Sequence, residues 1–312
     1  MSVAHTRMFA LAWGVSLAWS AATGVRGLMV RFLSYLASPD HPLNDNAKLI
    51  GIYGNYPVQR WDGKTAAPAQ ERVAEEVPVA LVYNGLPHVV MMASPADLED
   101  FALGFSLSEG VLKAPGELHG VEVVPLSEGV ELHMSIDLER YLPLEDQRRN
   151  LAGRSSCGLC GTETIEQAVR HPVPVGVGPR VQQQAVHRAF AALAENQRLN
   201  AVTGAVHAAA WASPAGELLL VREDVGRHNA LDKLIGAMIS AGHRVEDGFA
   251  LITSRASFEM VQKAATVGIT LLAAISAPTG LAIRLAQETG LTLVGFARNG
   301  QHNVYAHPVR LT

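Results

Sequence analysis

Apolar and polar positions in the first half of the chain follow the patterns of a small α+β unit. Apolar residues recur at helical spacing over 94–110, with Ser94 placed as the N-cap and Pro95 at the first helical position. Asn84-Gly85 is a residue pair typical of a tight hairpin turn, and runs rich in β-formers flank it. The predicted strands are 79–83, 87–92, 121–126 and 129–136.

The second half of the chain has a different hydrophobic pattern, in which short apolar strands alternate with helices. Strands are predicted over 218–221, 249–253, 270–276 and 291–297, and helices over 182–197, 229–241, 257–267 and 279–289. Asn229 and Asp232 are placed like a capping pair at the start of the second of these helices. Such alternation predicts βαβ units and a largely parallel sheet. We therefore expect an extension over 1–65, an α+β domain over 66–154 and an α/β domain over 155–312.

Open α/β sheets bind ligands beyond the carboxyl ends of their strands, where helix N-termini offer free N–H groups. Three strand-to-helix or strand-end turns fit that description, at 253–257, 276–280 and 296–301. Arg255 and Arg298 lie in two of them and can form forked contacts with phosphate. A phosphate-bearing ligand fits there, whereas the alternative is that these are ordinary capped turns.

Composition narrows the class of protein. The chain has 312 residues, is 48% hydrophobic and 17% charged, and carries a formal net charge of -4, so it has material for a packed core and no global basic surface for nucleic acid or anionic membrane. The uncharged apolar stretch from Met8 to Val25 resembles a signal peptide or a marginal membrane segment. A reading frame that starts too early, with the true start near Met29, explains it more simply, and we expect a cytoplasmic protein.

The two cysteines of the chain, Cys157 and Cys160, are three positions apart. Two cysteines are too few for the disulfide framework of a secreted protein. A zinc site would need further ligands, for example the histidines His207 and His228. A thioredoxin-like dithiol follows a buried strand, but the approach to Cys157 is polar, and the neighbouring glycines and serines make poor core. These points favour a thiolate nucleophile on a mobile arm, with Arg154 close enough in sequence to stabilise it, as sulfur relay requires.

Four segments resemble the formate dehydrogenase accessory sulfurtransferases, the FdhD family, and the resemblance runs from about Val73 to Leu311. They are Ser155–Gly161, Thr203–Ala210, Glu223–Lys233 and Thr253–Met260. The resemblance implies a cytoplasmic homodimer that takes sulfur from a cysteine desulfurase and passes it to the molybdenum cofactor before this enters formate dehydrogenase. The acceptor is the bis-guanine dinucleotide form. It also implies a C-terminal domain similar in fold to cytidine deaminases.

Residue roles follow from the same resemblance. Cys157 would hold the persulfide and Cys160 would assist or share it. Residues 296–301 match the family segment that binds the cofactor, and they also form one of the three strand-end turns described above. The expected binding residues are Ser254, Arg255, Phe296, Ala297, Arg298, Asn299, Gly300 and Gln301.

Three further expectations complete the sequence-based hypothesis. Deaminase chemistry is excluded because His207-Ala208-Ala209 lacks the required glutamate, and we expect no tightly bound metal and no nucleic-acid or membrane partner. A chaperone that binds the cofactor without moving sulfur is the alternative function. Glu223, Asp224, Arg227 and His228 serve either as caps and salt bridges or in ligand binding.

Overall fold

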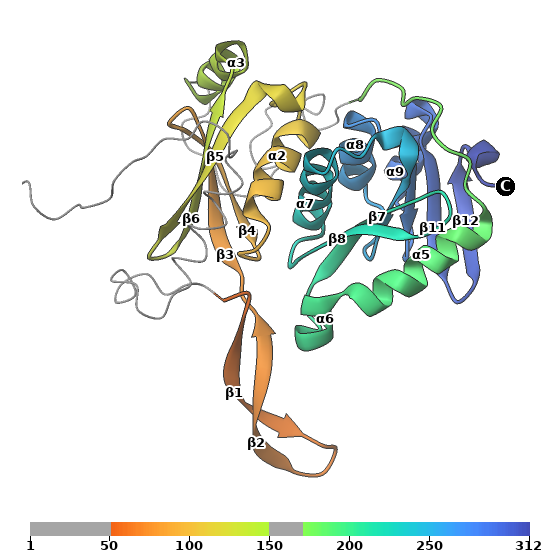
Figure 1. The fold of residues 1–312 in the computed structure, drawn as a ribbon. Helices are drawn as coiled ribbons and strands as arrows, with labels where there is room; N and C mark the ends of the chain where they lie inside the picture. The colour runs from red at the N-terminus through yellow and green to blue at the C-terminus, as the bar shows by residue number, and fades with distance from the viewer. Residues whose placement is uncertain (1–50, 150–170) are drawn as a thin grey trace, which may run out of the picture. The chain divides into compact units, whose positions relative to one another are not determined.

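The computed structural model describes residues 51–149 and 171–312. Its first folded part is a four-stranded sheet in the order β4-β3-β6-β5, with β3 and β6 parallel and the outer pairs antiparallel. Helix α2 packs on this sheet over an apolar core that includes Leu81, Phe101 and Leu132 (Figure 1). The elements are β3 Val77–Tyr83, β4 Leu86–Ala93, α2 Leu98–Ser108, η1 Pro115–Glu117, β5 Leu118–Leu126, β6 Gly129–Ile136 and α3 Leu138–Arg149.

The hairpin turn and all four strands predicted for this part are confirmed. Asn84 and Gly85 both have positive φ, at 47° and 82°, which is the backbone that a two-residue hairpin turn needs. The predicted helix start is wrong. Helix α2 begins at Leu98, while Ser94 is fully buried and its backbone N–H donates to Asp224 Oδ2 over 3.0 Å.

A two-stranded antiparallel ribbon precedes this sheet, formed by β1 Tyr53–Trp61 and β2 Ala66–Ala74. Strand β1 lies within the expected extension over 1–65. Most positions of both strands are exposed on both faces. A strand that buries neither face carries no alternation of apolar and polar residues, so the periodicity that predicts strands is absent.

The second part is a six-stranded sheet in the order β12-β11-β10-β9-β7-β8. Only the central strands β9, β10 and β11 are parallel, and β7, β8 and β12 join them by antiparallel pairing. The α/β class is thus confirmed, and the parallel arrangement holds for the centre alone. The elements are α5 Gln183–Asn196, α6 Arg198–Thr203, β7 His207–Ala212, β8 Leu218–Asp224, α7 Arg227–Ser240, η2 Val245–Asp247, β9 Phe249–Ile252, α8 Phe258–Thr266, β10 Leu271–Ala274, α9 Gly280–Thr289, β11 Thr292–Arg298, β12 Gln301–Ala306 and η3 Pro308–Arg310.

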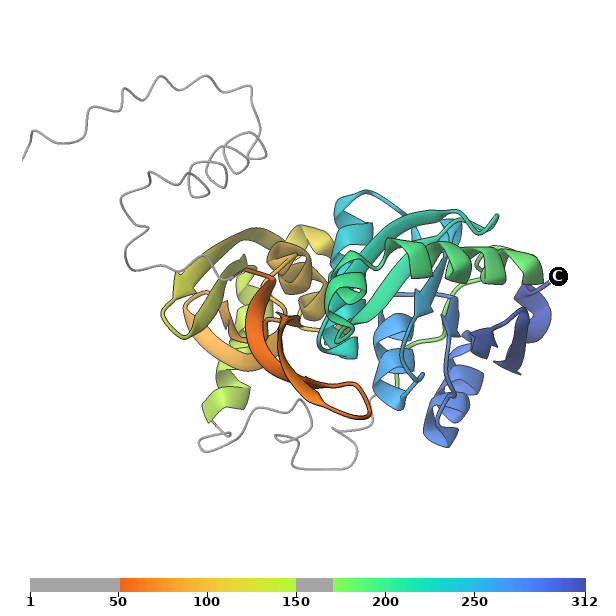
Figure 2. The ribbon, with the colours of Figure 1, turned by 90° about the horizontal axis from the view of Figure 1, so that it is seen from below.

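Helices cover both faces of the six-stranded sheet and give it three layers. One apolar core joins the sheet to α7, α8 and α9, and a second core on the opposite face joins it to α5 (Figure 2). Among the described residues, no helix combines the length and the apolar character needed to cross a membrane.

Helices α2 and α7 join the two parts at very close range. A Cβ on Gly104 of α2 would overlap the backbone oxygen of Asp232, and one on Gly236 of α7 would overlap the backbone of Asp100. Because no larger residue fits at either position, the two glycines allow the helix backbones to touch. The α2–α7 contact fixes the ends of the strands that lead into these helices.

Candidate functional site at the carboxyl edge of the sheet

The three turns singled out in the sequence meet at the carboxyl ends of β9, β10 and β11. Ala256 N donates to Ala277 O over 3.2 Å and Thr279 N donates to Ala256 O over 3.0 Å, which ties the first turn to the second. Phe296 N donates to Ser276 O over 3.1 Å and ties the second turn to β11. The tertiary structure therefore brings residues 253–257, 276–280 and 296–301 together along one rim, which we call the Arg298 rim.

Phe296 has an unusual backbone at this rim. Its φ is 54°, a left-handed value that is rare for an aromatic residue, and it lies within a bulge between Gly295 and Arg298. Gly295 permits the close approach of the neighbouring turn, because a Cβ there would lie 2.9 Å from Pro278 Cδ. Strain of this kind persists where the surroundings impose it and is common at ligand sites.

The bulge presents the Phe296 ring and the Arg298 guanidinium together. Phe296 is 36% exposed, and the guanidinium carbon of Arg298 lies 5.8 Å from the centroid of the Phe296 ring. Asn299 and Gly300, with φ of 53° and 73°, then form the tight turn into β12, where Arg298 pairs with Gln301. An exposed aromatic face beside a guanidinium can stack a base and contact a phosphate.

Not all of the predicted binding residues face solvent. Arg255, Arg298, Asn299, Gly300 and Gln301 are exposed. Ala297 is fully buried in the core beneath α5. Ser254 is 5% exposed and its hydroxyl donates to Arg255 O over 3.0 Å. The exposed members can contact a ligand through their side chains, whereas Ala297 and Ser254 hold the backbone of the rim in place.

The polar residues of the segment 223–233 fall into two groups. Some are hydrogen-bonded within the fold, and others can contact a ligand. Glu223 accepts hydrogen bonds from Leu199 N and Asn200 N, at 2.8 and 2.9 Å, and so caps α6. Asp224 is fully buried and accepts from Gly226 N, Asn229 Nδ2, Ser94 N and Lys233 Nζ, at 2.7, 3.0, 3.0 and 2.6 Å. These two carboxylates have the structural role.

Arg227 and His228, the first two residues of α7, remain available. No described residue accepts a hydrogen bond from the Arg227 guanidinium, although its Nε is buried. His228 Nε2 lies 3.6 Å from Glu259 Oε2, and this neighbouring ring, with the Ser257 hydroxyl, lowers the pKa of Glu259 to about 2. Burial and the nearby Arg227 and His228 lower the pKa of His207, the first residue of β7.

Sequence reasoning missed a buried ionic network beside this segment. Asp232 does not cap α7. Instead, at 1% exposure, it accepts from Ser108 Oγ and Lys263 Nζ, at 2.6 and 2.8 Å. Lys263 also pairs with Glu109 at 2.7 Å. Asn229 likewise donates to Met92 O, not to a cap. A charged residue at three- or four-residue spacing within the apolar face of a helix was the available signal.

The predicted sulfur-carrying residues, Cys157 and Cys160, lie outside the described residues. Across 51–149 and 171–312, no group of three or more His, Cys, Asp or Glu side chains is arranged to hold a metal ion. His207 and His228 are neighbours, yet the described chain supplies them with no third ligand.

The fold and its rim define a two-part α/β protein with a candidate ligand site at the carboxyl edge of its six-stranded sheet. A crystal structure of a formate dehydrogenase accessory protein from Desulfotalea psychrophila matches with a TM-score of 0.68 at 22% identity, covering 84% of this chain and all of that one. The FdhD/NarQ family model matches residues 74–312. The chain belongs to the FdhD/NarQ family.

Two relatives at higher identity share one name. A sulfur carrier protein FdhD from Cupriavidus necator is 51% identical over 277 residues, which cover 88% of this chain and 96% of the relative. A protein of the same name from Xanthomonas campestris pv. campestris is 55% identical over 254 residues, covering 81% and 90%. The family predicted from the sequence motifs is confirmed.

Proposed function

We propose that this protein is a cytoplasmic sulfur carrier that accepts sulfur on Cys157 from a cysteine desulfurase and delivers it to the bis-guanine dinucleotide form of the molybdenum cofactor, for use by formate dehydrogenase. Family membership and the name of the relatives support the carrier role. The single observation that supports a nucleotide as the ligand is the exposed pair of Phe296 and Arg298. This pair has a strained backbone and lies on the rim formed by three turns.

The first transfer is a thiol–persulfide exchange. The Cys157 thiolate attacks the outer sulfur of the donor's persulfide, the S–S bond of the donor breaks, and the donor cysteine leaves as a thiolate. Release of the carried sulfur as sulfide needs two electrons. Cys160 can supply them by attacking the inner sulfur of the Cys157 persulfide, which forms a Cys157–Cys160 disulfide that a cellular dithiol then reduces.

The Arg298 rim would bind the guanine dinucleotide. The Phe296 ring offers a face for a base, and the Arg298 guanidinium offers forked donors to phosphate oxygens. Arg255, on the turn that follows β9, offers a second set of such donors. A homodimer is part of the proposal.

Two measurements test the carrier role. After incubation with a cysteine desulfurase and cysteine, intact-mass analysis is expected to find one added sulfur in the wild type and none in Cys157→Ala. A host that lacks its own carrier is expected to mature formate dehydrogenase with the wild type and not with Cys157→Ala. Full maturation by Cys157→Ala, together with loss of guanine-nucleotide binding in Arg298→Ala, would instead support a cofactor-binding chaperone.

A further inference from the structure

Two buried nitrogen atoms at the turn between β8 and α7 form no short hydrogen bond. Arg227 Nε is shielded from solvent and has no partner in the described ranges, whereas His228 Nε2 has only the long contact of 3.6 Å with Glu259 Oε2. Leaving such groups unpaired costs free energy, so a native site of this kind usually has an acceptor that completes it. The Arg298 rim uses neither residue.

The backbone around these donors adds to the same electrostatic preference. Helix α7 is 14 residues long, its N-cap is Gly226, and no described side chain caps its first turn. The N–H groups and the dipole of a helix start attract an anion. Asp224, the carboxylate nearest in sequence, is committed to Lys233 Nζ and to the backbone of Ser94 and Gly226. It is therefore not free to pair with Arg227.

The remaining charged neighbours of Arg227 and His228 are Glu259 and His207. Glu259 lies beside His228 and accepts from Ser257 Oγ over 2.8 Å, so it orients that ring. His207 lies opposite Asp224 in the β7–β8 pairing and close to Arg227. We name Arg227, His228, His207 and the first turn of α7 the α7 corner. Its forked guanidinium matches a phosphate group better than a monovalent halide.

Sheet topology places the α7 corner on the same edge as the Arg298 rim. Strand β8 is antiparallel to β7, which is antiparallel to β9, so β8 and β9 run in one direction and end at the same edge. Four strand steps separate β8 from β11, which is about 19 Å at 4.8 Å for each step. A single phosphate cannot reach both positions, but an extended dinucleotide can.

We propose that the α7 corner binds a phosphate group and is a second anchor for the nucleotide ligand of the Arg298 rim. The identity of that ligand rests on the proposed function. The corner binds the phosphate through charge-assisted hydrogen bonds from Arg227, through the His228 ring and through the N–H groups at the start of α7. The distance between the corner and the rim favours a ligand whose phosphates lie far from its base.

The corner is tested by calorimetric titration of inorganic pyrophosphate into the full chain carrying Arg255→Gln and Arg298→Gln, so that the rim does not contribute. Adding Arg227→Gln is expected to weaken pyrophosphate binding roughly 10- to 100-fold, and Arg227→Lys less, because lysine keeps the charge but loses the fork. The matched control is Arg244→Gln, an exposed arginine that precedes β9 at the opposite edge.

Because Arg227 Nε has no partner among the described residues, Arg227→Gln is expected not to lower the unfolding temperature. Pyrophosphate binding that Arg227→Gln does not alter, or that Arg244→Gln weakens equally, would overturn the α7 corner. That result leaves the proposed function standing if Cys157→Ala still abolishes maturation. Conversely, maturation by Cys157→Ala would remove the carrier role without affecting the pyrophosphate titration.

Discussion

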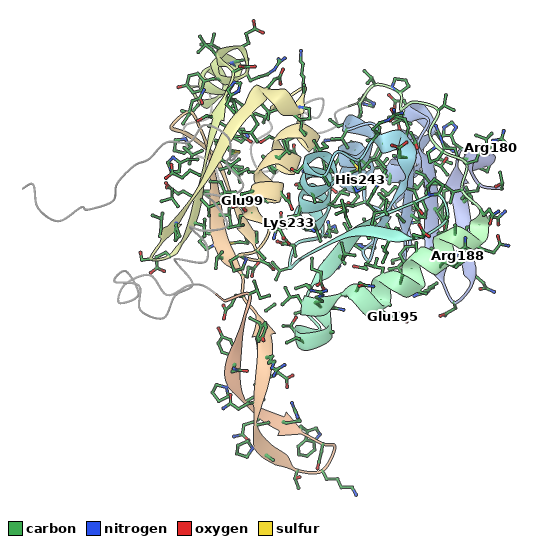
Figure 3. The ribbon with its side chains drawn as sticks, viewed as in Figure 1. Glu99, Arg180, Arg188, Glu195, Lys233 and His243 are labelled. Carbon is green, nitrogen blue, oxygen red and sulfur yellow. The ribbon has the colours of Figure 1, made fainter. Side chains whose placement is uncertain are left out.

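Lys233 of α7 donates to Asp224 Oδ2 over 2.6 Å, with both side chains fully buried. Its Nζ also donates to Ser94 O over 2.9 Å, so the pair joins β8, α7 and the segment that leads into α2. Figure 3 labels Lys233 on α7. A buried ion pair contributes little net stability when intact, but removing one partner leaves an uncompensated charge. This pair fixes the backbone from which Arg227 and His228 project.

We expect Lys233→Met to lower the free energy of unfolding by about 3–5 kcal/mol, because it leaves Asp224 buried and unpaired. Urea denaturation measures this loss. Lys64→Met, at an exposed position, is the control and should change stability little. In a double-mutant cycle with Asp224→Asn, the combined loss should be smaller than the sum of the two single losses. Additive losses would show that the two side chains do not act as a pair.

Gly104→Ala is expected to destabilise the protein by about 1–3 kcal/mol through overpacking. A Cβ there would overlap the backbone of Asp232, so α2 and α7 must move apart. Alanine otherwise favours a helix, which makes the direction of the effect diagnostic. Gly116→Ala, at an exposed position with open space around its Cβ, is the matched control. Equal unfolding temperatures for the two variants would contradict the close α2–α7 contact.

Phe296 offers a test of strain against binding. Phe296→Gly removes the ring and also relieves the left-handed backbone, whereas Phe296→Ala removes the ring alone. We expect the glycine variant to be more stable than the alanine variant by about 1 kcal/mol. Both should bind guanosine diphosphate more weakly than the wild type in calorimetry. Undiminished nucleotide binding by both variants would exclude a stacking role for Phe296.

Stability in acid should depend on Glu259. His228 and Ser257 lower the pKa of this carboxyl to about 2 in the folded protein, below its ordinary value of 4.5. The folded state therefore binds its proton less readily than the unfolded state, and the stabilisation is present above about pH 4.5 and lost as the pH falls to about 2. Unfolding free energies of wild type and Glu259→Gln, measured from pH 6 to pH 2, should converge in acid. A constant difference would disprove the link.

Local patterns in the sequence determined part of the secondary structure and the family. Helical spacing and caps placed α5, α8 and α9, and the motifs around Cys157, His207, Glu223 and Thr253 named the FdhD family. Alternating strands and helices also indicated which turns would share an edge. These features could be predicted because they depend on residues close in the chain.

Only the tertiary structure decided what the polar residues at that edge do. Ser94 and Asp232 look like helix caps in the sequence, but both are buried. Ser94 donates to Asp224, more than a hundred positions away, and Asp232 pairs with Lys263, more than thirty positions away. The left-handed backbone of Phe296 depends on the packing of Gly295 against Pro278, and the unpaired state of Arg227 depends on Asp224 being satisfied elsewhere. Such long-range pairing leaves no signal in the local sequence, because a serine or an aspartate before or within a helix looks the same whether it is a cap or a buried hydrogen-bond partner.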